Sequence, residues 1–416
     1  MSFVGSTVDV GAVVELDVGA AAHGGSCVAR HDGRVIFVRH ALPGEKVHAK
    51  ITEVAKTFAR ADAVKVLAPS AHRVEPRCPV ARPDGCGGCD WQHADLDFQR
   101  AIKAGIVAEQ LRRLAGIERD VVVEDLPGGG FDWRTRVRFA VDDEGRAGFR
   151  KSRSHEVVAV DQCPIAHPVV EAAGVEAKQW NRASEVEVAG SASSGERLLR
   201  TTGRRDGVTR THGPDHLIEE AAGRRFRVSA GGFWQVHPAA ADTLTEAVMA
   251  GLGVRPGERV LDLYAGAGLF AASLAAAVGA AGRVTAVESA VLAGADAAHN
   301  LADLAQVSVV RGDVAKALAG MNEEVDVVVL DPPRSGAGAK VVNAICRLEP
   351  RAIAYVACDP AALARDLATF DAARYRLASL RAFDLFPQTH HVECVAVVTR
   401  GFGAQRDVED QPGGAQ

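Results

Sequence analysis

One cysteine of the chain stands where a thiol can act as a nucleophile. Residues 353–357 are apolar, and most are branched or aromatic, so they predict a buried strand that ends at Cys358. Asp359 and Pro360 follow it, and they suit the cap and the first turn of a helix over residues 361–370. Open α/β sheets place their chemistry at such junctions, and a helix N-terminus favours a thiolate over a thiol. The alternative is that Cys358 is a small buried hydrophobic residue.

Four other cysteines have the types and spacing of metal ligands. Two of them form a Cys-x2-Cys pair around two glycines, which lets backbone amides approach bound sulfur. Four thiolates can hold either tetrahedral zinc or an iron–sulfur cluster. The unequal spacing, the distant fourth cysteine and the proline that follows it favour a 4Fe–4S cluster over zinc. The predicted ligands are Cys78, Cys86, Cys89 and Cys163.

Length and composition limit the classes of protein that fit. A chain of 416 residues predicts two or three domains, and 47% apolar residues are enough for real cores. No apolar run is long enough for a membrane span and no signal peptide is evident, so we expect a cytoplasmic protein whose thiols stay reduced. The formal net charge is 48 − 53 = −5, so nucleic-acid binding would have to come from local basic patches.

Two regions precede the expected catalytic domain. Residues 1–67 predict a small barrel of five short strands, because apolar runs alternate with turn signals such as residues 31–34 and 43–46. Such a barrel can bind nucleic acid or serve only as a structural accessory. Residues 68–222 predict a central α+β domain that contains the four cysteines.

The central domain also contains a candidate basic surface. With the period of a strand, Arg134, Arg136 and Arg138 share one face, and apolar residues share the other. Such a face can contact RNA phosphates, but it can equally be an ordinary solvated sheet face.

Residues 223–404 predict a parallel sheet covered by helices, because apolar strands alternate with helices. Asp-x-Tyr-x-Gly-x-Gly over residues 262–268 is a nucleotide-type turn, which dinucleotide-binding proteins also use. An acidic residue at the end of the second strand can hold a ribose diol, and one after the third can contact adenine. This succession favours S-adenosylmethionine, and the predicted contacts are Tyr264, Gly266, Gly268, Glu288, Asp313 and Asp331. Residues 405–416 are expected to be disordered.

Several of these motifs together resemble one family along nearly the whole chain. Residues 44–47 and 57–61 are similar to the TRAM domain. The C-terminal motifs resemble those of RNA uracil-5-methyltransferases, and they are Phe-Trp-Gln-Val at 233–236, Asp-Pro-Pro-Arg-Ser-Gly at 331–336, Tyr-Val-Ala-Cys-Asp-Pro at 355–360 and Gln-Thr-His-His-Val-Glu at 388–393.

The resemblance implies roles for particular residues. Cys358 would add to C6 of uracil, and Glu393 would be the base that later removes the C5 proton. Asp331 would lie near the methyl donor and the uracil, and Gln235 would touch the cofactor. The chain departs from the usual pattern at Asp359, where the family has Asn, and at His237, which stands in place of another Asn.

The resemblance also implies a fold and a substrate. The expected fold is an α/β Rossmann-like methyltransferase domain with an N-terminal five-stranded, OB-like TRAM barrel and a central α+β iron–sulfur domain. The expected substrate is RNA, with 23S rRNA favoured over tRNA, and we expect a monomer without an obligate protein partner. Two other classes remain as alternatives: a methyltransferase for small molecules and a non-catalytic RNA-binding factor.

Overall fold

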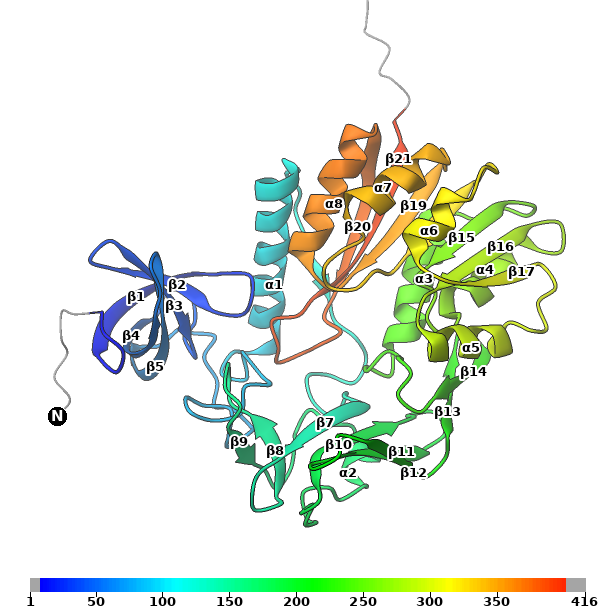
Figure 1. Ribbon diagram of the computed structural model, residues 1–416. Helices are drawn as coiled ribbons and strands as arrows, with labels where there is room; N and C mark the ends of the chain where they lie inside the picture. Colours follow the sequence, from blue (N-terminus) through cyan, green and yellow to red (C-terminus); the bar gives the residue numbers. More distant parts are fainter. Residues whose placement is uncertain (1–7, 402–416) are drawn as a thin grey trace, which may run out of the picture.

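The computed structural model describes residues 8–401, and it contains a barrel, a central sheet and a larger α/β sheet (Figure 1). In this view the barrel stands to the left of the α/β sheet, and the strands of the central sheet lie below the α/β sheet. The predicted disorder of residues 405–416 falls outside the described residues. The predicted fold class, an α/β domain with an N-terminal barrel and a central α+β domain, is confirmed.

The N-terminal strands form a barrel because their side chains alternate between interior and solvent. Along β4, Val47, Ala49 and Ile51 are buried, while the residues between them are partly or fully exposed. Within the described residues the barrel consists of the five predicted strands in the order β1-β2-β3-β5-β4. Their bounds are β1 (Val13–Ala21), β2 (Cys27–His31), β3 (Arg34–Arg39), β4 (Lys46–Val54) and β5 (Phe58–Ala68).

The central sheet has the order β12-β11-β10-β7-β8-β9. Its strands are β7 (Arg136–Val141), β8 (Ala147–Arg150), β9 (Val157–Ala159), β10 (Ala183–Gly190), β11 (Arg197–Gly203) and β12 (Thr209–His212), and the short helix α2 (Pro168–Glu171) precedes β10.

Carboxylates lie beside two of the three arginines of the predicted basic face, Arg136 and Arg138 of β7. Arg136 Nη2 lies 3.0 Å from Glu219 Oε1. Arg138 Nε lies 3.3 Å from Glu185 Oε1, and its Nη2 lies 3.6 Å from Glu187 Oε2. The alternation along the strand was predicted, but the partners Glu219, Glu185 and Glu187 were not. The sequence left open whether this face contacts RNA or is an ordinary solvated sheet face, and these ion pairs favour the second interpretation.

A hairpin joins the central sheet to the catalytic sheet. It consists of β13 (His216–Ala221) and β14 (Arg224–Ser229), so it spans residue 222, at which the sequence placed the domain boundary. Asp296 of α5 accepts hydrogen bonds from the Ser229 N–H at 2.7 Å and the Ser229 hydroxyl at 2.6 Å. Because the hairpin packs on α5, we propose that the boundary lies before His216.

The catalytic sheet has the order β17-β16-β15-β18-β19-β21-β20-β6. Every residue of β18 and β19 is buried, as expected for parallel strands covered on both faces. The order reverses between β15 and β18, which is where open α/β sheets bind ligands. The strands are β15 (Arg259–Leu263), β16 (Arg283–Glu288), β17 (Val307–Arg311), β18 (Val327–Leu330), β19 (Ala352–Ala357), β20 (Tyr375–Phe383) and β21 (Glu393–Arg400).

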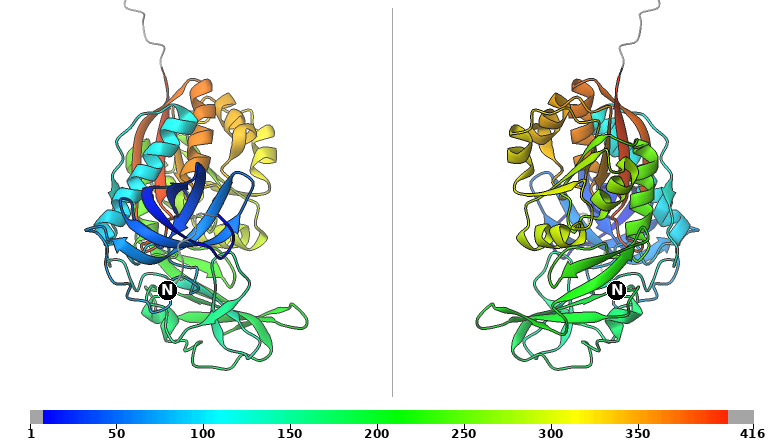
Figure 2. Two further views of the ribbon diagram at one scale, coloured as in Figure 1. Left: turned by 90° about the vertical axis from the view of Figure 1, so that its left-hand side faces the viewer. Right: turned by 90° about the vertical axis from the view of Figure 1, so that its right-hand side faces the viewer.

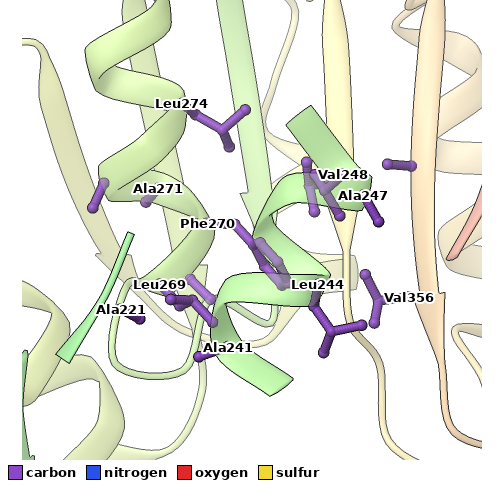
Figure 3. Close-up of a cluster of buried hydrophobic side chains, with 14 of the residues drawn as sticks. Ala221, Ala241, Leu244, Ala247, Val248, Leu269, Phe270, Ala271, Leu274 and Val356 are labelled. Atoms are coloured by element: carbon purple, nitrogen blue, oxygen red, sulfur yellow. The ribbon is translucent and has the colours of Figure 1, made fainter. Parts of the chain in front are cut away.

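Helices pack on both faces of this sheet and form two apolar cores. On one face, Leu244 of α3 and Phe270 of α4 meet Val356 of β19 (Figure 3). On the other face, Val342 of α7 and Leu363 of α8 belong to the second core. The helices are α3 (Ala240–Leu252), α4 (Leu269–Val278), α5 (Val291–Asn300), α6 (Val314–Ala319), α7 (Gly338–Arg347) and α8 (Pro360–Ala372).

The central region also contributes directly to the catalytic sheet. The short strand β6 (Val123–Glu124) pairs in parallel with Ala382 and Phe383 of β20. The helix α1 (Leu96–Gln110) continues as a π-helical turn (Leu111–Ala115), and both contact α8. Figure 1 shows α1 beside α8. The sequence did not predict that this region completes the sheet.

A buried ion pair connects α1 to the segment after β20. Lys103 Nζ lies 2.5 Å from Asp384 Oδ1 and donates to the Phe386 carbonyl at 3.1 Å. Both side chains are almost fully buried, and burial lowers the pKa of Lys103 in spite of the nearby carboxylate. Neither charge can therefore be solvated if the other is removed.

We predict that Asp384→Ala lowers the free energy of unfolding by about 3–5 kcal/mol, because it leaves the Lys103 ammonium buried without a partner. Urea unfolding followed by circular dichroism measures this loss. The exposed pair of Arg376 and Asp371 provides the control, and Asp371→Ala should cost less than about 1 kcal/mol. Equal losses in the two variants would contradict the prediction.

Candidate active site at the carboxyl edge of the sheet

Cys358 lies where the sequence placed it, between the end of β19 and the start of α8. Asp359 caps α8, because its Oδ1 accepts a hydrogen bond from the Ala362 N–H at 2.7 Å. The thiol lines a small pocket at this edge of the sheet. The other residues that line the pocket are His23, Arg334, Asp359, Pro360, His390, His391 and Val392.

The strand directions bring two carboxyl groups to the same edge. Cys394 pairs with Ala357, so the start of the antiparallel strand β21, at Glu393, lies beside the end of β19. Asp331 directly follows β18, which pairs with β19 on its other side. The structure thus gathers Cys358, Glu393 and Asp331, which the sequence singled out separately.

The thiol of Cys358 is held in its protonated form. Burial and the nearby carboxyls of Glu393 and Asp331 raise the pKa of Cys358 to about 12, and Arg334 acts in the opposite direction. The sequence-based expectation that the α8 N-terminus favours the thiolate is therefore wrong for the free chain. The partial charge of a helix end is smaller than the combined effect of desolvation and two acidic neighbours.

The pKa values of the two carboxyls are raised as well. Burial raises the pKa of Glu393 well above its ordinary value, and the charge of Asp331 adds to this, whereas Arg334 opposes it. Burial also raises the pKa of Asp331. Two nearby buried carboxyls resist ionising together.

The turn after β15 has a backbone that suits close approach of a ligand. Tyr264, Gly266 and Gly268 have φ angles of 63°, 55° and 91°. A Cβ on Gly268 would lie 2.8 Å from Leu301 Cδ1, so this position has no room for a side chain. The positive φ angles of Gly266 and Gly268 favour glycine at both positions. At Gly268 the close approach of Leu301 excludes any side chain as well.

Glu288 and Asp313 lie at the same edge of the sheet. Glu288 is the last residue of β16, and Asp313 follows the neighbouring strand β17. Glu288 Oε2 accepts from the Gly266 N–H at 2.9 Å, and Oε1 accepts from the Ala290 N–H at 2.6 Å. Each carboxylate oxygen retains a second lone pair for a ribose hydroxyl. Asp313 caps α6 through the Lys316 N–H at 3.0 Å. The charge of Asp313 is one cause of the raised pKa of Tyr264, after burial, so the two side chains lie near each other.

Asp262 belongs to this site although we did not select it from the sequence. Its Oδ2 accepts from the Ala271 N–H at 2.8 Å, and its buried Oδ1 has no partner. Burial raises the pKa of Asp262 to about 8. The signal was present, since Asp262 opens the Asp-x-Tyr-x-Gly-x-Gly motif. A buried polar atom without a partner is expected where a ligand group completes it.

The segment that carries Gln235 is anchored from two sides. The Val236 carbonyl accepts from the N–H of Thr135 at 2.8 Å and from its hydroxyl at 2.9 Å. Trp234 packs in the same core as Ala265 and Ala267 of the glycine-rich turn. Gln235 is partly buried beside these anchors.

The four predicted metal ligands line one small apolar cavity. Cys78, Cys86, Cys89 and Cys163 share it with side chains such as Phe149 and Val160. The Gly88 N–H donates to Cys86 Sγ at 3.3 Å, as the glycines between the paired cysteines suggested. Among residues 8–401, however, no three Cys, His, Asp or Glu side chains converge closely enough to hold a single metal ion.

Two family models match the N-terminal and C-terminal parts of the chain, and several known proteins match almost its whole length. The TRAM domain model matches residues 7–64, and the tRNA (Uracil-5-)-methyltransferase model matches residues 217–401. An uncharacterised RNA methyltransferase of Streptomyces coelicolor is 48% identical, over 94% of this chain and 93% of its own. The 23S rRNA (uracil(1939)-C(5))-methyltransferase RlmD of Shewanella sediminis is 32% identical, over 94% of this chain and 97% of its own. The chain belongs to the RNA uracil-5-methyltransferase family.

A solved relative confirms the fold of the enzyme. The tRNA (uracil-54, C5)-methyltransferase of Pyrococcus abyssi, solved with S-adenosyl-L-homocysteine, matches 92% of this chain and 99% of its own with a TM-score of 0.70 and 23% identity. As a member of this family, the enzyme methylates RNA and takes the methyl group from S-adenosylmethionine. Within residues 8–401, no helix of the enzyme has the length and apolar character needed to cross a bilayer.

The loop between β20 and β21 leads into Glu393, and the central region of the enzyme holds it. Gln99 donates to Gln388 Oε1 at 3.0 Å and accepts from the Gln388 N–H at 2.9 Å. Asp90, next to Cys89, lies 2.6 Å from Nδ1 of His390. Sequence reasoning missed these contacts, because partners almost three hundred residues apart leave no local signal.

We predict that alkylation of Cys358 by iodoacetamide in the free enzyme accelerates about tenfold per pH unit between pH 7 and 9. The reason is that the thiolate is the nucleophile and that the pKa of the thiol lies near 12. Mass spectrometry of the labelled peptide measures the rate. A plateau near pH 8 would show that the site stabilises the thiolate instead.

The variant Glu393→Gln sharpens this test. It removes a charge that raises the pKa of Cys358, so labelling of Cys358 at pH 9 should become faster. Cys346 is an internal control, because burial raises its pKa to about 11 without a contribution from Glu393.

Proposed function

We propose that the enzyme methylates C5 of one uridine in structured RNA by covalent catalysis, with Cys358 as the nucleophile and Glu393 as the base. The observation that carries this proposal is the meeting of a thiol and two carboxyls at the edge where the sheet order reverses. Uracil C5 is a poor nucleophile by itself. Addition of sulfur at C6 moves an electron pair towards C5 and O4, which makes C5 enolate-like and able to accept a methyl group.

The two buried carboxyls of Asp331 and Glu393 beside the thiol support this assignment. An ionised carboxyl at this edge can accept the proton of the Cys358 thiol as sulfur bonds to C6, and that proton passes to solvent before Glu393 acts as the base. S-adenosylmethionine supplies the methyl group that C5 receives. Glu393 then takes the proton from C5, the C6–S bond breaks, and the electron pair restores the C5–C6 double bond. The thiolate of Cys358 leaves and the ring is aromatic again.

We propose that Tyr264, the glycines of the turn, Glu288, Asp313 and Gln235 hold the donor. The free lone pairs of Glu288 and the unpartnered Oδ1 of Asp262 support a polar ligand at this edge. Asp331 lies between this region and Cys358, as a residue near both donor and uracil must.

A cleft between the barrel and the cysteine-bearing loop is a second candidate for RNA binding, and carboxylates pair with several of its basic residues as they do on β7. Phe37 and Arg60 of the barrel line it together with His390, which also lines the pocket of Cys358. Arginine and lysine can contact phosphates, and an exposed aromatic ring can stack on a base. The target base must be flipped out of its stack to reach the thiol. The other basic residues of the cleft are Arg39, Arg82, Lys151 and Arg153.

We favour 23S rRNA as the substrate, and the same chemistry on tRNA is the alternative. The similarity to the 23S rRNA enzyme of Shewanella sediminis, which extends over the whole chain, supports 23S rRNA. The family model that matches residues 217–401 is described as a tRNA methyltransferase, and this supports the alternative. We place the reaction in the cytoplasm, where the thiols stay reduced.

We predict that the enzyme forms a covalent adduct with RNA that contains 5-fluorouridine, because fluorine at C5 cannot leave as a proton does. Transcripts of 23S rRNA and of tRNA should be offered in parallel, and adducts detected as a shift on a denaturing gel. Cys358→Ala should abolish the adduct, and Cys346→Ala should not. An adduct on neither RNA, or one that persists without Cys358, would reject the mechanism.

We further propose that Cys78, Cys86, Cys89 and Cys163 hold a 4Fe–4S cluster. The supporting observation is that all four thiols line one apolar cavity, as the ligands of a single cluster must.

We predict that enzyme purified without oxygen contains about four iron atoms and four sulfides per chain and absorbs broadly near 400 nm, as such clusters do. Cys86→Ser should lose both iron and absorbance, while Cys346→Ser should keep them. Stoichiometric zinc without iron would support the alternative ligand.

A further inference from the structure

A loop of the barrel reaches the catalytic pocket. The loop joins β1 to β2 over residues 22–26, and the Gly25 carbonyl accepts from the indole N–H of Trp91 at 3.0 Å. A Cβ on Gly25, whose φ is 86°, would lie 3.0 Å from both Asp90 Cγ and His390 Cβ. The loop therefore packs tightly against the central region and the loop before β21. In the left view of Figure 2 the barrel stands in front of α1.

One contact between a histidine and a carboxylate joins this loop to the residue after the nucleophile. His23 Nε2 lies 3.1 Å from Asp359 Oδ2, and both residues line the pocket of Cys358. The other oxygen of Asp359 caps α8, so the side chain makes two separate contacts. Burial by itself would raise the pKa of Asp359, but the contact with His23 and the capping hydrogen bond hold it below its usual range.

The pair explains why an acidic residue follows the cysteine in this chain. An Asn at position 359 could cap α8 equally well. Only a carboxylate adds a charge that can pair with a histidine from another domain. The cap is therefore a property of α8 alone, whereas the second oxygen connects α8 to the barrel.

We propose that His23 and Asp359 form a clasp that holds the barrel loop as one wall of the catalytic pocket, so that RNA bound by the barrel reaches Cys358 in one register. Both are positioning residues, and neither takes part in bond making. The inference rests on the proposed function for its RNA, but the clasp itself is a contact that can be tested without turnover.

The chain contains a matched control for this contact. Asp95 caps α1 through the Phe98 N–H at 2.8 Å, and its other oxygen lies 2.9 Å from Nδ1 of His72. This pair has the same chemistry as the clasp, but it lines a different pocket from that of Cys358. Substitution of Asp95 thus reports the general effect of losing such a pair.

The first measurement is hydrogen exchange of the free enzyme. In His23→Ala and in Asp359→Ser, which keeps a capping hydroxyl, the amides of residues 22–26 should exchange faster. Asp359→Asn should restore part of the protection, since its oxygen can still accept a hydrogen bond from His23. Asp95→Ser should leave residues 22–26 unchanged. Unchanged exchange in both clasp variants would overturn the clasp.

The second measurement is methyl transfer to structured RNA. In His23→Ala and Asp359→Ser, the KM for RNA should rise about fivefold, which is the size expected for one partly exposed pair, while the KM for S-adenosylmethionine stays the same. The double variant should be no worse than either single variant, because both remove one shared contact. Faster exchange with an unchanged KM for RNA would overturn the role in RNA positioning.

The two proposals fail in different ways. If the unmodified enzyme forms no adduct with 5-fluorouridine RNA, the covalent mechanism fails, and hydrogen exchange still decides whether the clasp exists. If the adduct forms equally fast in the clasp variants and the original enzyme, the mechanism stands and the inference about register is rejected.

Discussion

The position of Glu393 depends on how the segment before β21 is held. This segment must leave β20, cross the edge of the sheet and return antiparallel beside β19. Lys103 and Gln99 of α1 fix its start and its middle, and Asp90 fixes His390 near its end. These contacts come from the central region, so the base of the proposed reaction is placed by residues that precede the catalytic domain in the chain.

The raised pKa values in the pocket follow from the close packing of a thiol and two carboxyls. A buried thiol beside two buried carboxyls cannot ionise readily, and the carboxyls themselves cannot both ionise. Arg334 is the cation that opposes this effect at Cys358 and at Glu393. The free enzyme therefore keeps Cys358 protonated, and nucleophilic character arises only as a neighbouring carboxylate accepts the proton. A thiol in this state is also protected from adventitious oxidation.

Local patterns predicted the barrel, the alternating strands and helices, and the residues at the strand ends. Cys358, Glu288, Asp313 and Asp331 could be located because each follows an apolar strand and parallel strands end at one edge. The partners of Arg136 and Arg138 could not be predicted, since they depend on the register of other strands and on a hairpin far along the chain. The protonation state of Cys358 could not be predicted from the sequence either, because it depends on how deeply the thiol is buried. Roles such as that of Glu393 came from family resemblance rather than from pattern.

The parallel pairing of β6 with β20 has a consequence for how the enzyme can be divided. The C-terminal segment that matches the methyltransferase family begins after β6 and α1. Expressed alone, it would leave the edge of β20 at Ala382 and Phe383 open, and it would uncover the apolar face of α8 that packs against Val107 and Leu111. Exposed strand edges and apolar patches promote aggregation. The segment that the family model matches is therefore smaller than the sheet to which it belongs, and chimeras with a new RNA-binding region would have to retain residues 96–126.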